Sequence, residues 1–147
     1  MKIDVMGQPS YAQPQETGRR VRILIADDHP EIRKAVRYML GDQSRFEVCG
    51  EATDGAEAVQ AAKLLKPDVV VLDVTMPVLN GFEVAREIRS TLPETAIVIL
   101  SGNADKVFIE QAKKIGIRCY VAKTKAGESL VKAIDAAVQG GEFVVVD

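Results

Sequence analysis

The chain has 147 residues, of which 47% are hydrophobic and 27% charged. Its 19 basic and 21 acidic residues nearly cancel, so bulk charge indicates neither a nucleic-acid-binding protein nor a protein of anionic membrane surfaces. The length suffices for one domain with a substantial core, and no apolar run is as long as a membrane span. Cys49 and Cys119 both lie in apolar runs and are expected to be reduced core thiols. With no signal-peptide pattern at the start, we expect a cytoplasmic protein that does not enter a membrane.

Residues 1–20 contain three glutamines, two prolines and two glycines without a sustained apolar period, and we expect a flexible leader there. From Val21 onward, short runs rich in β-branched residues alternate with amphipathic segments. The predicted elements, in chain order, are strand 21–26, helix 31–40, strand 46–52, helix 56–66, strand 69–72, helix 82–92, strand 96–100, helix 105–115, strand 119–122 and helix 128–139.

This alternation predicts an α/β fold, a doubly wound, five-stranded parallel sheet with five helices on its two faces. The strands are almost continuously apolar, as strands covered on both sides must be. We expect one domain over residues 21–141 and the start of a linker or a C-terminal tail over residues 142–147.

Polar residues stand where several predicted strands end. Asp27 and Asp28 follow the first strand and Asp73 follows the third, while Ser101 and Lys123 follow the last two. In such sheets the ligand site lies outside the carboxyl ends of the strands, so these side chains are expected on one rim. Two carboxylates in contact near a protein surface repel by about 4 kcal/mol. A divalent cation with oxygen ligands would compensate that repulsion.

The acidic residues also have simpler interpretations. Asp28 precedes Pro30 and Glu31 in a pattern typical of a helix N-cap, although that role leaves Asp27 unexplained. His29 is the single histidine, and no serine or cysteine nucleophile motif accompanies it, so we expect an exposed first-turn residue. Asp73 has no helix to cap for several residues, which favours a role as a nucleophile toward phosphorus over a solvated strand end.

The other two rim residues are individually less specific. Ser101 alone is more typical of a helix N-cap, a role for which Asn103 competes, and Gly102 leaves backbone room beside a phosphate. Lys123 offers a point charge for phosphate oxygens, but a strand-end lysine is often merely solvated, and Lys125 is a rival.

Taken together, these residues resemble the receiver domain of two-component response regulators. The resemblance covers residues 21 to about 140 and rests on the following set, in this order: Asp27-Asp28, Asp73 with Met76-Pro77 and Gly81, Ser101 and Lys123. The segments Ala26-Asp27-Asp28-His29-Pro30 and Gly140-Gly141 are similar to those of regulators that carry a C-terminal helix-turn-helix output domain. The implied fold is flavodoxin-like with strand order 2-1-3-4-5, in agreement with the pattern of elements.

The resemblance implies a role for each matching position. Asp73 is the expected phosphoacceptor, and Mg²⁺ is the expected cofactor. The implied Mg²⁺ ligands are Asp28, Asp73 and the backbone carbonyl of Thr75, with Asp27 acting through a metal-bound water. Ser101 and Lys123 are expected to bind the phosphoryl oxygens. Tyr120 is expected to change rotamer on activation, and the positions of Thr75 and Gly102 to influence how fast water removes the phosphoryl group.

The implied function is a phosphorylation-activated switch rather than an enzyme with its own substrate. The expected partners are a sensor histidine kinase or a phosphotransfer protein, with a second copy of the chain as a further candidate. Contact with DNA would occur only through an output domain, and no segment here is long or basic enough to be one. The chain also departs from the family pattern, because Thr124 rather than proline follows Lys123.

Three other functions stay open. A Mg²⁺-dependent phosphohydrolase with an aspartate nucleophile would need a second aspartate where Thr75 stands. A flavin-binding electron carrier would need a phosphate loop where Asp27 and Asp28 stand. A protein-binding module on the same fold would work without phosphorylation, which leaves the acidic set without a purpose.

Overall fold

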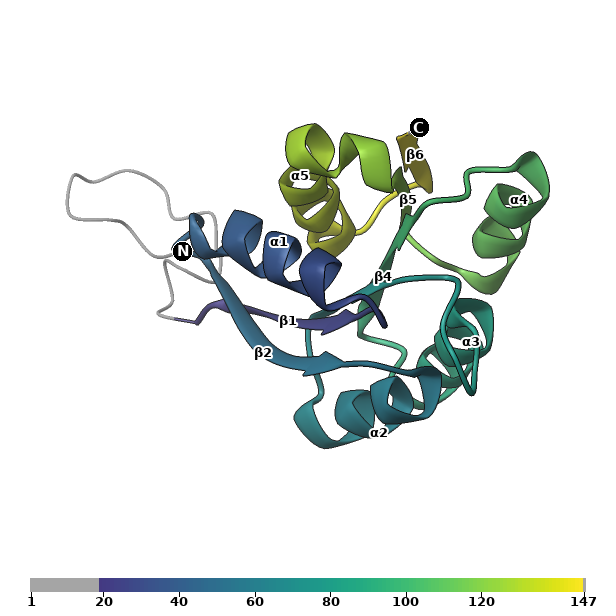
Figure 1. Ribbon diagram of the computed structural model, residues 1–147, viewed down its shortest axis with the longest axis horizontal. Coiled ribbons are helices and arrows are strands. Elements are labelled where there is room, and N and C mark those ends of the chain that lie inside the picture. Colours follow the sequence, from purple (N-terminus) through teal and green to yellow (C-terminus); the bar gives the residue numbers. More distant parts are fainter. Residues whose placement is uncertain (1–18, 147) are drawn as a thin grey trace.

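The computed structural model describes residues 19–146, so nearly all of the leader predicted over residues 1–20 lies outside the described residues. The chain alternates strands and helices along its length (Figure 1). The elements are β1 Val21–Ala26, α1 Pro30–Gly41, β2 Phe46–Ala52, α2 Gly55–Leu65, β3 Val69–Leu72, α3 Gly81–Thr91, β4 Ala96–Ser101, α4 Lys106–Ile115, β5 Cys119–Ala122, the 3₁₀ turn Lys123–Lys125, α5 Ala126–Gln139 and β6 Val144–Val146.

The sheet is parallel throughout, with the order β2-β1-β3-β4-β5-β6. The predicted order of the first five strands is confirmed, but the prediction of five strands is wrong. β6 comes from the segment expected to be a linker or tail, and Val144 pairs with Cys119 at the edge of β5. Three valines are too short a run to predict a strand, and pairing with β5 supplies the backbone hydrogen bonds that stabilise it.

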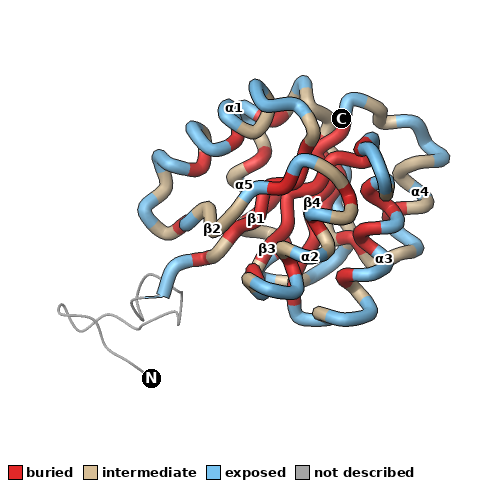
Figure 2. The backbone as a smooth tube through the Cα atoms, turned by 60° about the horizontal axis from the view of Figure 1, so that its bottom comes forward, coloured by how far each residue is buried: buried red, intermediate tan, exposed pale blue. Residues whose placement is uncertain are grey.

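Helices cover both faces of the sheet. One apolar cluster packs α1 and α5 on alternate strand residues such as Ile23 and Val98. The other packs α2, α3 and α4 on the intervening residues, such as Leu24 and Ile97. Buried residues accordingly follow the central strands, whereas the outer sides of the helices are exposed (Figure 2). Burial on both faces explains the continuous apolar character of these strands.

Side chains satisfy several helix ends. Asn80 and Glu83 form a reciprocal capping box at the start of α3, so this helix begins at a fixed point after the β3 loop. At the opposite end of the fold, the Arg22 guanidinium donates to the Leu65 carbonyl at the end of α2. No helix within residues 19–146 is both long enough and apolar enough to cross a membrane.

Candidate metal and phosphate site

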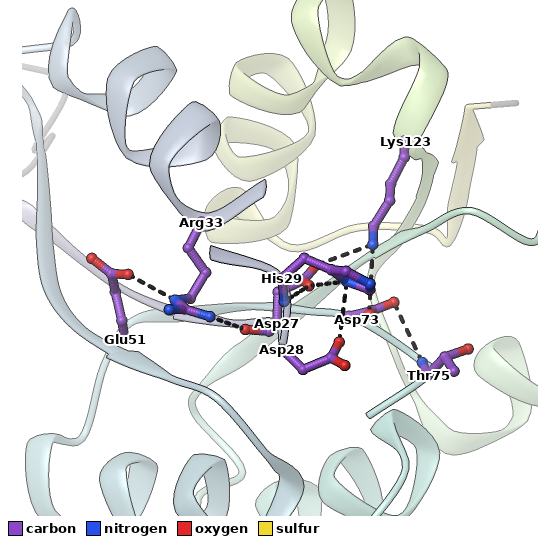
Figure 3. Close-up of polar contacts among 8 residues, drawn as sticks. All are labelled: Asp27, Asp28, His29, Arg33, Glu51, Asp73, Thr75 and Lys123. Carbon is purple, nitrogen blue, oxygen red and sulfur yellow. Dashed lines mark hydrogen bonds and ion pairs between the residues drawn. The ribbon is translucent and has the colours of Figure 1, made fainter. Parts of the chain in front are cut away.

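Three carboxylates meet at the carboxyl ends of β1 and β3. One oxygen each from Asp27, Asp28 and Asp73, together with a nitrogen of His29, lie within 4.8 Å of one another. Lys123 approaches the same group from the turn after β5 (Figure 3). The predicted convergence of strand-end residues on one rim therefore brings four of the five predicted residues into contact, namely Asp27, Asp28, Asp73 and Lys123.

Asp27 is held on both of its carboxylate oxygens. Its Oδ1 accepts a hydrogen bond of 2.9 Å from the His29 backbone N–H, and its Oδ2 lies 3.1 Å from Lys123 Nζ. The residue is only 3% exposed. Asp27 is therefore a buried carboxylate whose two oxygens face different partners, and its predicted role through a metal-bound water stays a prediction.

Asp28 has a different environment. The oxygen Oδ1 is shielded from solvent and accepts no hydrogen bond, although the His29 imidazole Nδ1 lies 3.2 Å away. The helix-capping alternative for Asp28 is wrong, since His29 is the N-cap residue of α1 and no side chain caps this helix. A shielded carboxylate oxygen without a donor is costly to leave unpaired, and a bound cation would satisfy it.

His29 is exposed, as expected, but its ring does not point away into solvent. Its Nδ1 lies 3.0 Å from Asp27 Oδ1 as well as close to Asp28. The hydrogen bond with Asp27 and the nearby charge of Asp28 raise the pKa of His29 above its usual value. When it is protonated, the imidazole adds positive charge to the acidic cluster.

Asp73 lies at the end of β3 and is 3% exposed. Burial and the charge of Asp27 raise the pKa of its carboxyl group, while Lys123 acts in the opposite direction. Lys123 Nζ lies 3.5 Å from Asp73 Oδ2, and the Thr75 backbone N–H donates to Oδ1 over 3.3 Å. Asp73 is therefore a buried carboxylate in partly repulsive surroundings.

The remaining predicted residues line the neighbouring strands β4 and β5. Ser101 is buried at the end of β4, and its hydroxyl accepts from the Asn103 N–H at 3.0 Å. Tyr120 is fully buried, and its hydroxyl donates to the Asn103 carbonyl. Gly102 is exposed and faces open space. Neither Ser101 nor Asn103 is the N-cap residue of α4, because Asp105 occupies that position, although its side chain makes no capping hydrogen bond.

The residues present fit a hard divalent cation. The carboxylate oxygens of Asp27, Asp28 and Asp73 are the donors that Mg²⁺ prefers, and Oδ1 of Asp28 has no hydrogen-bond donor that such an ion would have to replace. The structure gives the Thr75 N–H a partner but does not define the surroundings of its carbonyl, so the predicted role of that carbonyl stays a prediction.

Two residues of the site were not predicted from the sequence. Asn103 receives the Tyr120 hydroxyl on its backbone carbonyl, and Arg33 donates to the backbone carbonyl of Asp27 at 2.8 Å. Both contacts involve backbone oxygens, which carry no signature in the sequence. For Arg33, a weak signal existed, because it lies one helical turn after His29 and so faces the same end of α1.

Comparison with known proteins agrees with this geometry. Residues 23–135 match the family described as response regulator receiver domain. This chain belongs to that family and is a receiver domain of a response regulator.

Individual relatives give the same picture. Over 82% of its length, the chain is 39% identical to the uncharacterized transcriptional regulatory protein YxjL of Bacillus subtilis strain 168, of which it spans 56%. It is 34% identical to the chemotaxis protein CheY of Thermotoga maritima, covering 78% of this chain and 94% of that protein. Among solved structures, a LuxR-family two-component response regulator from Aurantimonas sp. SI85-9A1 superposes with a TM-score of 0.80 at 32% identity, covering 85% of this chain and 89% of the other. The chain thus spans little more than half of a curated transcriptional relative and nearly all of a chemotaxis one.

Proposed function

We propose that this receiver domain accepts a phosphoryl group on Asp73 from a phosphohistidine of a sensor kinase or phosphotransfer protein. The observation that carries the proposal is the position of Asp73: a buried carboxylate beside Lys123, with two further carboxylates within ligand distance. A carboxylate oxygen of Asp73 would attack phosphorus, and the P–N bond of the phosphohistidine would break with its electron pair staying on the imidazole nitrogen.

The residues around Asp73 divide the work. Asp28 and Asp73, the Thr75 carbonyl, and Asp27 through a water would hold Mg²⁺, which when bound neutralises charge on the entering phosphoryl group. Lys123 already contacts Asp73 and would pair with the new phosphoryl oxygens. Burial of Asp73 would limit the bulk water that competes with the phosphohistidine during transfer.

Ser101 and Tyr120 would carry the signal away from the site. Ser101 lies at the end of β4, and Asn103 links it to the Tyr120 hydroxyl. A phosphoryl group that draws the Ser101 hydroxyl toward it would break the bond from Asn103 N–H. To move a two-state switch from 1:99 to 99:1, phosphorylation must favour the active state by about 5.5 kcal/mol.

The lifetime of the phosphoryl group would depend on the two open positions nearby. Thr75 is exposed, and no atom lies within 4 Å of a methyl group built on Gly102. Both positions would therefore leave a path for attacking water. The chain would act on no other substrate, and we place it in the cytoplasm with a sensor kinase as partner. Homodimerisation, and DNA contact through an output domain, belong to the same proposal.

The proposal is tested by incubating the purified chain with acetyl phosphate and Mg²⁺ and measuring intact mass. Wild type should gain the mass of one phosphoryl group, and Asp73→Asn should gain none. Asp105→Asn is the matched control, because Asp105 is an exposed aspartate near the same rim outside the cluster, and it should label like wild type. Labelling that persists in Asp73→Asn would refute Asp73 as the acceptor.

A further inference from the structure

Arg33 connects helix α1 to the backbone of the acidic cluster. Its Nη1 donates to the Asp27 carbonyl at 2.8 Å, and its Nε donates to Glu51 Oε1 on β2 at 3.0 Å. The Arg33 side chain is only 15% exposed. Figure 3 shows the guanidinium between Glu51 and Asp27, on the side of Asp27 away from Lys123.

Glu51 fixes the direction of the Arg33 guanidinium. Its second oxygen, Oε2, accepts from Arg37 Nε at 2.7 Å, one helical turn further along α1. The hydrogen bonds from Arg37 and Arg33 lower the pKa of Glu51, so this carboxylate is ionised at neutral pH. The charge-assisted bond from Arg33 Nε to Glu51 therefore holds the guanidinium in the geometry that reaches Asp27.

The Asp27 carbonyl belongs to the peptide group that joins Asp27 to Asp28. The Asp27 carboxylate is fixed by the His29 N–H and by Lys123, and the bond from the His29 N–H closes a ring that includes this peptide. That ring limits rotation of the peptide plane, but neither bond engages its carbonyl oxygen. Among residues 19–146, Arg33 is the donor that the structure gives to this carbonyl. Rotation of the peptide plane would change the direction of the Asp28 side chain. It would therefore also move Oδ1 of Asp28, which accepts no hydrogen bond.

We infer that Arg33 is a positioning residue for the metal site, which holds the Asp27–Asp28 peptide so that the Asp28 carboxylate points at the cation. This inference rests on the proposed Mg²⁺ binding. Outer partners that orient metal ligands typically change metal affinity by 10- to 100-fold when they are removed. We expect Arg33→Met to weaken Mg²⁺ binding roughly tenfold.

The sign of the effect separates positioning from simple electrostatics. Arg33→Met removes a positive charge close to a cation site, so a purely electrostatic role predicts tighter Mg²⁺ binding. Positioning predicts weaker binding. Arg37→Met is the matched control, because Arg37 lies on the same helix and bonds the same carboxylate but is not in contact with Asp27. It should bind Mg²⁺ as well as wild type or slightly more tightly.

The measurement is isothermal titration of the unphosphorylated chain with Mg²⁺, with thermal unfolding of each metal-free variant alongside. Weaker binding by Arg33→Met with near-normal binding by Arg37→Met supports the inference. Unchanged or tighter binding by Arg33→Met overturns it, even if that variant unfolds at a lower temperature, since the role would then be merely structural. If Arg33→Met does not fold, Arg33→Lys is judged by the same criterion, because lysine keeps the charge but cannot keep both bonds. Failure of wild type to bind Mg²⁺ would instead refute the metal site of the proposed function.

Discussion

Gly81 offers the sharpest test of how tightly the backbone surrounds Asp73. It is the first residue of α3, and its N–H donates to the Val74 carbonyl at 2.6 Å. A methyl group built on Gly81 would lie 2.2 Å from the Asp73 carbonyl oxygen and 2.7 Å from the Val74 Cα. Both contacts are with backbone atoms of the segment that carries Asp73, so Gly81→Ala can fit only if that segment or the start of α3 moves.

The magnitude follows from two opposing effects. Overpacking a tight site typically costs about 1–3 kcal/mol, and rigid backbone neighbours place Gly81 near the upper end of that range. Alanine is favoured over glycine in a helix by up to about 1 kcal/mol, which offsets part of the cost. We expect Gly81→Ala to lower the free energy of unfolding by about 2 kcal/mol. For a domain of this size that corresponds to a fall in melting temperature of roughly 8 °C.

Gly127→Ala is the matched control for this prediction. Gly127 lies in the first turn of α5, and a methyl group built there meets no atom within 4 Å. Circular dichroism during thermal unfolding should show Gly127→Ala at or slightly above the wild-type melting temperature. The reasoning about close packing around Asp73 would be refuted if Gly81→Ala were as stable as Gly127→Ala. Labelling by acetyl phosphate should also slow in Gly81→Ala and stay normal in the control.

Three further predictions concern charge and backbone strain. Asp73→Asn should raise the melting temperature without metal, because burial and Asp27 disfavour the ionised carboxylate. It should also abolish the stabilisation of about 2.7 kcal/mol expected for wild type at a Mg²⁺ concentration 100 times its dissociation constant, and equal metal-dependent shifts in thermal melts would contradict this. His29 has a raised pKa, so its protonated form stabilises the metal-free fold. This stabilisation is fully present below pH 6.5 and is lost as the pH rises through the folded-state pKa. Urea titrations at several pH values should show the loss in wild type but not in His29→Gln. Val78 is exposed and has φ 72°, a left-handed conformation that costs a β-branched residue about 1–2 kcal/mol, so Val78→Asn should raise the melting temperature by a few degrees, and a fall would count against strain at this position.

The fold could be predicted because its strands are covered on both faces. That burial produces continuous apolar runs such as Val69–Leu72, and the amphipathic segments between them define the helices. β6 could not be predicted in the same way. Its three valines are largely exposed in the fold, and what makes them a strand is the free edge of β5, a tertiary feature with no local signature.

The site was predictable to the extent that strand ends determine where side chains gather. Asp27, Asp28, Asp73 and Lys123 meet because parallel strands end on one rim. The contact of Arg33 with a backbone carbonyl depends on side-chain rotamers and on Glu51 from another strand, and a residue pattern contains neither. His29 was correctly expected to be exposed, but its ring orientation over the carboxylates could not be inferred from its position alone.

The charges around Asp73 explain why the site suits a divalent cation and then a phosphoryl group. When ionised, Asp27, Asp28 and Asp73 carry three negative charges. Lys123 contributes one positive charge, so two negative charges are left without a counter-charge. At separations below 5 Å, each pair of like charges repels by about 3–4 kcal/mol at an effective dielectric constant of 20. The raised pKa of His29 is the response of the metal-free protein to this excess, since a protonated imidazole supplies part of the missing charge. A divalent cation supplies all of it. A bound cation would repel a protonated imidazole and favour proton release from His29, so metal binding and positive charge on His29 would oppose each other. A phosphoryl group on Asp73 would add negative charge to the metal-bound site. Lys123, whose Nζ already lies 3.5 Å from Asp73 Oδ2, is the nearby cation that would pair with the phosphoryl oxygens.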